Sequence, residues 1–332
     1  MYAIQRLADG VYAAVPTRPS GLLVESNNLF IVNDTDVVVV DTGFTPTLTR
    51  SALAELRKIT DKPVTTVINT HWHDDHILGN VVYAEAFPNV EFVGHRRALE
   101  YLPGKGVENR KGMLGEGPGL IAQMRDGLAK NLTLGGKPID DEIRNSYLAD
   151  IAQWEPYERE APAVRVIVPT TPVDDHLTLT RGARTIDVRY LGRGHTAGDL
   201  VVYLPHEKIL AAGDLVIAPI PLVGADQSYV VDWANTLDAL MAINVTTIVP
   251  GHGPVMHDHG FIEQWQKLLR ELTRQTEAAL ARGDTQDQAI KSIDVEQYRK
   301  AMTGDDAILN MLFRNYVVSP SVIAIYRDKL GR

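Results

Sequence analysis

The chain has 332 residues, of which 45% are hydrophobic and 23% charged, so it is long enough to bury a full core and has an ordinary globular composition. A formal net charge of −9 argues against nucleic acid as a partner, and no run reaches the roughly eighteen apolar residues of a membrane span. No secretory leader opens the sequence, so a cytoplasmic protein is expected, or a periplasmic or secreted one if a leader was removed before Met1. The absence of cysteine excludes disulfides, thiolate metal ligands and a cysteine nucleophile.

The first 95 residues alternate between predicted strands and helices. Strands are expected at "GVYAAVP", "LLVESNNLFIV" and "DVVVVD", followed by an amphipathic helix over residues 45–60. The β-branched run "PVTTVI" predicts a buried strand, and residues 77–87 and 90–95 predict a helix and a short strand. This order of elements indicates an α/β protein.

The pattern changes between residues 96 and 161, where apolar residues recur at helical spacing and predict a helical insertion. Strands are expected again at "AVRVIVP", "HLTLT", "TIDVRYL", "DLVVYLP" and "KILAAGD", and a helix at "VDWANTLDALMAI" leads into a strand at "VTTIVPGHGP". Residues 261–332 predict a mostly helical C-terminal extension. An insertion of this size is usually functional, so we expect residues 96–161 to cover a site and set its specificity.

The stretch "NTHWHDDHILGN" places three histidines and two aspartates within the six residues from His71 to His76. A solvated polar loop is the simplest interpretation, but the stretch lies between a predicted core strand and a helix, where α/β proteins place their sites. In an extended segment, side chains two apart point the same way, so His71 and His73 can meet one cation while Asp75 and His76 turn towards a second point. Imidazole and carboxylate ligands favour zinc and its neighbours in the first transition row.

Several apolar strands end in residues of the same kind. "DVVVV" ends in Asp41 and "TTVINT" in His71, and later strands lead to His195, Asp214 and His252. Residues at the carboxyl ends of strands can converge on one crevice although they are far apart in sequence. A solvated loop gives no reason for such repetition downstream.

Together these motifs resemble the metallo-β-lactamase superfamily of metal-dependent hydrolases. The family's His-x-His-x-Asp-His motif stands at residues 71–76, and "VVVVDTG", "GRGHTAGDL", "AAGDLV" and "VPGHGP" match its other elements in the family's order. The resemblance covers roughly residues 10–260 and implies one αββα sandwich domain over residues 1–332, interrupted by the helical insertion and followed by the extension.

The resemblance also implies two zinc ions per chain, with iron or manganese as alternatives. By position, His71, His73 and His195 would hold one metal, Asp75, His76 and His252 the other, and Asp214 would bridge them. An aspartate at the bridging position is similar to glyoxalase II and lactonases, and unlike the thiol-ligand β-lactamases. Asp75 would also orient the attacking hydroxide. Asp41 would hold a ligand or the loop of residues 71–76, which we call the motif loop.

The implied function is hydrolysis at an acyl carbon of a lactone, ester, thioester or amide, with weak β-lactamase activity as a further possibility. Tyr229 is a candidate for the substrate pocket, and the apolar loop "LVIAPIPLVGAD" after Asp214 is expected to form a wall that suits an acyl group. The expected partner is a small molecule, with neither nucleic acid nor membrane, and the oligomeric state stays open.

Three alternatives remain at this point: a mononuclear iron dioxygenase-like enzyme of the same fold, a phosphodiesterase or RNase Z-like nuclease, and a non-catalytic metal-binding scaffold. The other five histidines are expected to be surface or helix-capping residues: His95, His176, His206, His257 and His259.

Overall fold

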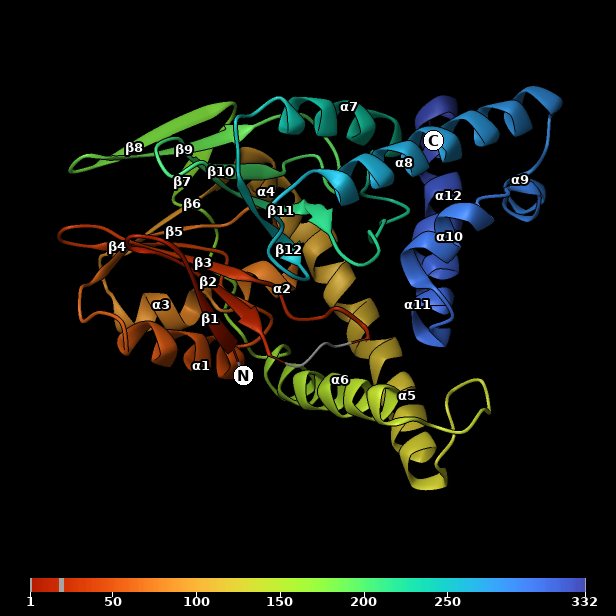
Figure 1. Ribbon diagram of the computed structural model, residues 1–332, viewed down its shortest axis with the longest axis horizontal. Helices are drawn as coiled ribbons and strands as arrows, with labels where there is room; N and C mark the ends of the chain where they lie inside the picture. Colours follow the sequence, from red (N-terminus) through yellow and green to blue (C-terminus); the bar gives the residue numbers. More distant parts are fainter. Residues whose placement is uncertain (1, 18–20, 332) are drawn as a thin grey trace. The chain divides into compact units, whose positions relative to one another are not determined.

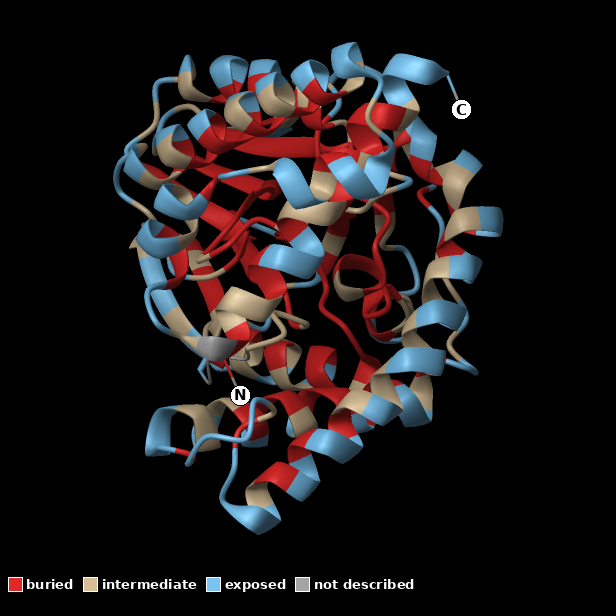
Figure 2. Cartoon of the chain, turned by 90° about the vertical axis from the view of Figure 1, so that its right-hand side faces the viewer, coloured by how far each residue is buried: buried red, intermediate tan, exposed pale blue. Residues whose placement is uncertain are grey.

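The computed structural model describes residues 2–17 and 21–331. The chain forms two compact units, Met1–Val188 and Arg189–Arg332, and the division falls within strand β9 (Arg184–Tyr190). In Figure 2 many strands are buried along most of their length, and many helices are buried on one side and exposed on the other. That residues 1–332 form one domain stays a prediction.

The first unit is built on a seven-stranded sheet in which neighbours in sequence are neighbours in space (Figure 1). Neighbouring strands from β1 to β4 pair antiparallel, and those from β4 to β7 pair parallel. The carboxyl ends of β4, β5 and β6 therefore lie at the same edge of the sheet. The strands are β1 (Tyr2–Ala8), β2 (Val11–Pro16), β3 (Asn28–Val32), β4 (Val37–Val40), β5 (Val64–Ile68), β6 (Glu91–His95) and β7 (Thr171–Val173).

Helices α1 (Pro46–Arg57) and α3 (Asn80–Ala86) cover one face of this sheet (Figure 1). Thr45 begins α1, because its hydroxyl accepts a hydrogen bond from the amide of Leu48 and because proline follows at the first helical position. The apolar stripe of α1 and the buried side of α3 form one core cluster with the strands, which includes Val37, Val39, Ala52, Leu56 and Tyr83. Burial of this cluster fixes the sheet edge that carries the motif loop.

The segment predicted as a helical insertion consists of four consecutive helices. They are α4 (Arg96–Tyr101), the π-helix η1 (Leu102–Gly106), α5 (Val107–Lys130) and α6 (Asp141–Glu160), and α5 and α6 pack side by side (Figure 1). Asp140 starts α6 by accepting a hydrogen bond from the Ile143 amide, and Asn131 ends α5 in the left-handed conformation.

The prediction of a strand at "AVRVIVP" is wrong. Residues 164–169 form no strand, and the strand that pairs with β6 begins two residues later, at Thr171. Pro162 and Pro169 bracket the segment, and proline has no amide hydrogen to give to a sheet. The first unit ends with β8 (His176–Arg181) and the start of β9, as predicted.

The second unit contains β10 (Leu200–Leu204), β11 (Ile209–Ile217) and β12 (Thr247–His252), with β11 in the middle, antiparallel to β10 and parallel to β12. Helices α7 (Val230–Met241) and α8 (Gly260–Arg282) pack against each other. Trp233 of α7 and Trp265 of α8 meet edge to face with ring centroids 5.2 Å apart, and both are buried. This aromatic contact anchors the two helices.

The C-terminal extension is helical, as predicted, and continues with α9 (Gln286–Ser292), α10 (Glu296–Thr303), α11 (Ala307–Leu312), the π-helix η2 (Phe313–Val318) and α12 (Ser319–Leu330). Val322 and Tyr326 of α12 pack on Ala279 of α8 and Ala289 of α9. The continuous helix from Ile308 to Leu330 has the length to cross a membrane, and an 18-residue window in it has a mean hydropathy of 1.3, but 50% of that window is buried inside the structure. The sequence reading had found no such run.

Candidate metal centre

The first half of the candidate centre lies directly after β5. His71 Nε2 and His73 Nδ1 are 3.0 Å apart, and both side chains are buried. The chain bends here and brings the two rings edge to face with centroids 4.6 Å apart, while Trp72 between them is buried against His73 and Tyr101. His71 and His73 therefore present two ring nitrogens to one point.

Asp75 and His76 form a second pair on the short helix α2 (Asp74–Ile77). The Asp75 carboxylate lies 3.2 Å from His76 Nε2. His76 is fully buried, whereas the Asp75 side chain keeps 20% of its surface exposed. Asp75 is thus the candidate ligand of this loop that water reaches most easily.

Asp41 joins the two pairs from the end of β4. Its carboxylate accepts hydrogen bonds from the Thr70 amide and hydroxyl, each at 2.8 Å, and lies 2.8 Å from His76 Nδ1. The contact with Asp41 places the His76 proton on Nδ1 and leaves Nε2 to face Asp75. Asp41 itself has a φ of 57°, a left-handed conformation that aspartate tolerates better than most residues.

The second half of the candidate centre lies in the second unit and is built around Asp214 of β11. Its two carboxylate oxygens face two imidazoles: Oδ2 is 3.4 Å from His195 Nε2, and Oδ1 is 3.5 Å from His252 Nε2. All three side chains are buried. One carboxylate between two imidazoles is the arrangement that a bridging ligand requires.

The surroundings of Asp214 leave little freedom. His195 Nδ1 lies 3.0 Å from the carbonyl oxygen of Leu222, which fixes the proton on Nδ1 and leaves Nε2 towards Asp214. A Cβ atom on Gly251 would lie 1.9 Å from Asp214 Oδ1, so only glycine allows β12 to pass this close.

Asp199 supports the turn that follows His195. Its carboxylate accepts hydrogen bonds from the amide and the hydroxyl of Thr196, at 2.8 and 2.7 Å. Burial raises the pKa of Asp199 to about 7, against the hydrogen bonds from Thr196, which lower it. Nothing in the sequence reading had singled this residue out, although it stands in the "GHTAGD" motif.

The donor set fits divalent zinc within each half. Two ligands bound at about 2.0 Å in tetrahedral geometry lie about 3.3 Å apart. The four pairs of candidate ligand atoms within the units are separated by 3.0, 3.2, 3.4 and 3.5 Å. The donor set has five imidazoles and two carboxylates. Imidazole-rich sites favour zinc over harder cations such as magnesium, which bind mainly oxygen ligands.

Three residues of the first unit form a network that the sequence reading missed. Arg110 of α5 donates from Nε and Nη2 to both carboxylate oxygens of Asp74, at 2.8 and 2.6 Å, and the Tyr157 hydroxyl of α6 donates to Asp74 Oδ2 at 2.8 Å. Asp74 is the first residue of the short helix α2. Nothing local identifies its partners.

Tyr229 lies half-buried before α7 between two guanidinium groups. Arg193 and Arg327 stack on its ring at 4.3 and 5.0 Å from the centroid. Arg193 is also paired with Asp232, at 2.5 Å. The expected role of Tyr229 in a substrate pocket stays a prediction.

The five other histidines are placed outside this donor set. His95 is buried and caps α4, because its Nδ1 accepts from the Arg97 amide at 3.0 Å. Among the rest, His176, His206 and His257 are exposed and His259 is partly exposed.

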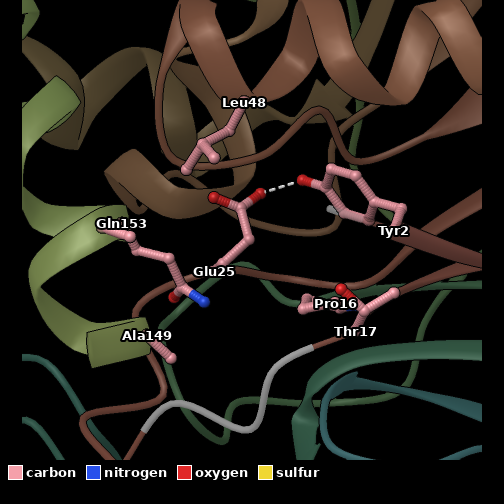
Figure 3. Close-up of a pocket in the computed structure, with 8 residues that line it drawn as sticks. Tyr2, Pro16, Thr17, Glu25, Leu48, Ala149 and Gln153 are labelled. Carbon is pink, nitrogen blue, oxygen red and sulfur yellow. Dashed lines mark hydrogen bonds between the residues drawn. The ribbon is translucent and has the colours of Figure 1, made fainter. Parts of the chain in front are cut away.

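A small cavity lies beside the loop that follows Asp41 (Figure 3). Its buried Glu25 accepts hydrogen bonds from the Tyr2 hydroxyl and from the Phe44 amide, the latter at 3.3 Å. Figure 3 shows the side chains of Tyr2 and Glu25 pointing towards each other. At about 40 Å³ the cavity has room for water but not for a substrate, so we assign it a structural role.

Comparison with known proteins decides the family. Residues 22–252 match the sequence model of the metallo-β-lactamase superfamily, a span that contains every candidate ligand. The chain belongs to the metallo-β-lactamase superfamily. The resemblance found in the sequence, and the αββα fold class that it implied, are confirmed.

Relatives within the superfamily differ in activity. The chain is 28% identical to a linear primary-alkylsulfatase from a Pseudomonas species, over 89% of this chain and 54% of that protein. It is 25% identical to a type 2 metallo-β-lactamase from Bacillus cereus, over 76% of this chain and 75% of that protein. Both relatives are hydrolases by name, in agreement with the expectation of an enzyme.

A solved structure shows the same fold over the whole chain. A stereoselective inverting sec-alkylsulfatase from a Pseudomonas species superposes with a TM-score of 0.66 and 15% identity, over 100% of this chain and 50% of that one. The chain thus spans about half the length of the alkylsulfatases that it matches.

Proposed function

We propose that the chain is a dinuclear zinc-dependent hydrolase. The proposed ligands of the first metal are His71, His73, His195 and Asp214, and those of the second are Asp75, His76, Asp214 and His252. The observation that carries this proposal is the pair geometry inside each unit, where buried imidazoles and carboxylates face one another at the spacing of zinc ligands. The match to the family over residues 22–252 supports it.

When bound, two divalent cations would supply a water with a pKa lowered towards 7 and a Lewis acid that polarises an oxygen bonded to the electrophilic atom of the substrate. The protein's own residues then have distinct tasks. Asp75, partly exposed, accepts a hydrogen bond from the attacking water and orients it. Asp41 and the Leu222 carbonyl hold His76 and His195 in the tautomers whose Nε2 lone pair can bind a metal.

An alkyl sulfate ester is the substrate class that the comparisons favour. The alkylsulfatase match extends over 89% of the chain by sequence and the alkylsulfatase structure over all of it, whereas the B. cereus β-lactamase matches 76%. The fuller match includes the C-terminal helices that lie beyond the family model, which ends at residue 252. We therefore place hydrolysis of a sulfate ester first.

Hydrolysis at an acyl carbon is the second candidate, favoured by the match to 75% of the length of the B. cereus metallo-β-lactamase. The apolar residues after Asp214 do not add to this support. The loop after Asp214 was expected to offer an apolar wall to the substrate, but Leu215, Val216, Ile217 and Ile220 are fully buried. Core packing accounts for their apolar character.

Two measurements test the proposal. Metal analysis of protein purified without added metal should find two zinc ions per chain; one iron, or no metal, would contradict it. A panel with a primary alkyl sulfate, an aryl ester, a lactone, a thioester, a β-lactam and an aryl phosphodiester should give the highest kcat/KM for the alkyl sulfate. An acyl substrate ahead by more than about tenfold, or about 1.4 kcal/mol of transition-state preference, would establish the second candidate instead.

A further inference from the structure

Asp74 lies in sequence between two proposed ligands, His73 and Asp75, but its carboxylate faces the helical insertion. Both of its oxygens accept hydrogen bonds. Arg110 forms a bidentate ion pair with them at 2.8 and 2.6 Å, and the Tyr157 hydroxyl donates a third hydrogen bond at 2.8 Å. Planar guanidinium fits carboxylate in one orientation, so this contact fixes the direction of the Asp74 side chain as well as its position.

The network is shielded from water. Asp74 is 3% exposed, Tyr157 is fully buried, and the Arg110 side chain keeps only 13% of its surface. Burial lowers the pKa of Arg110, but the hydrogen bonds and charge of Asp74 outweigh it, so the guanidinium stays charged. Burial and then the negative charge of Asp74 raise the pKa of Tyr157, so its hydroxyl remains a donor.

Helix α6, which carries Tyr157, is itself anchored to the segment that follows β4 and to α1. The Tyr157 ring stacks on Phe44 with centroids 4.1 Å apart, three residues after Asp41. Glu160, at the end of α6, accepts a hydrogen bond from the amide of Thr47 in α1 at 3.0 Å. Helix α6, which packs against α5, is therefore held by contacts on both sides of the start of α1.

We propose that Arg110 and Tyr157 are positioning residues of the metal centre, which hold Asp74 towards the insertion and so make Asp75 the aspartate that faces the metals. The inference rests on the proposed function. Two adjacent aspartates compete for a cation in a flexible loop, since either carboxylate can reach it. Tying Asp74 to a buried guanidinium removes that competition and neutralises a charge that the cations would otherwise attract.

A second ion pair supplies a matched control. Arg125 of α5 and Glu155 of α6 also join the two helices, at 2.6 Å, but both side chains are 51% exposed and neither touches the motif loop. If Arg110 serves only to hold the helices together, loss of Arg125 should have a similar effect. If it positions the loop, only Arg110 should matter to the metals.

The test compares Arg110→Met, Tyr157→Phe and Arg125→Met in the full chain. Zinc affinity is measured by competition with a chromophoric chelator, and cobalt(II) is used as a spectroscopic probe of ligand geometry. We expect Arg110→Met to weaken zinc binding by about tenfold or more and to shift the visible cobalt spectrum. Tyr157→Phe, which is nearly isosteric, should produce a smaller change in the same direction, and Arg125→Met should leave both readouts unchanged.

The double variant Asp74→Asn/Arg110→Met separates positioning from misfolding, because it removes the buried charge together with its partner. Zinc affinity that recovers part of the loss seen in Arg110→Met supports the inference. The inference is overturned if Arg110→Met and Tyr157→Phe bind zinc as tightly as the wild type and their cobalt spectra are unchanged. That result would leave the proposed function intact. A wild-type chain that binds no metal overturns both.

Discussion

Asp41 and His76 are 35 residues apart in sequence, and a 2.8 Å hydrogen bond joins Asp41 Oδ2 to His76 Nδ1. The same carboxylate binds Thr70, the residue before His71. A single side chain at the end of β4 thus sets the orientation of one proposed ligand and the start of the motif loop.

We expect Asp41→Ala to weaken zinc binding by about 10- to 100-fold, because His76 loses the acceptor that fixes its tautomer. Asp41→Asn should retain more affinity, since asparagine tolerates the positive φ and keeps one acceptor oxygen. Asp36→Asn is the matched control, as Asp36 is also a buried aspartate, paired with Arg181 at 2.9 Å. It should lower the melting temperature without changing zinc affinity measured by chelator competition.

Chelation should abolish hydrolysis and lower the melting temperature. Under the proposed function zinc would bind only the folded chain, and at a free concentration about 1,000 times Kd it would add about 4 kcal/mol to the free energy of unfolding. The measurement is a thermal scan with and without chelator, followed by restoration with added zinc. Full activity after chelation would end the metal hypothesis.

Asp214→Ala should reduce the bound metal from two ions towards one or none, because it removes the only carboxylate proposed to bridge them. Gly251→Ala should have a similar effect although it replaces no ligand, because the added Cβ would overlap Asp214 Oδ1 and displace the carboxylate. Gly115→Ala is the control: no atom lies within 4 Å of a Cβ there, and alanine is the better helix former. Metal content by elemental analysis decides; unchanged stoichiometry in both test variants would mean that the bridge is misassigned.

Stability should fall on the acid side through His95. Burial lowers the pKa of His95, and its Nδ1 must stay unprotonated to cap α4. The unfolded chain, with a histidine pKa of about 6.5, therefore binds a proton before the folded chain does, and stability is lost as pH falls below that value.

The variant His95→Asn keeps a capping side chain that does not titrate, so its melting temperature should depend less on pH between about 7 and 5. The exposed His176→Asn serves as control and should follow the wild type. Zinc affinity near neutral pH should be the same in all three proteins, because His95 is not a proposed ligand. A wild-type profile with the same slope as His95→Asn would contradict the role of this cap.

The family, the fold class and the candidate ligands could all be predicted from the order of the amino acids. The histidines and aspartates of residues 71–76 are close in sequence, and the strand-helix order around them follows from local periodicity. His195, Asp214 and His252 were recognisable because each ends or follows an apolar strand within a family motif. Such information is local, so it needs no knowledge of which segments meet.

The packing of the folded chain, in contrast, decided which partners hold these residues. Arg110 and Tyr157 lie 36 and 83 residues from Asp74, and the Leu222 carbonyl lies 27 residues from His195. It also decided that the apolar loop after Asp214 is core and that residues 164–169 pair with no strand. A hydrogen bond between distant segments leaves no periodic pattern in either one, because its energy depends on an approach that the packing of the whole unit fixes.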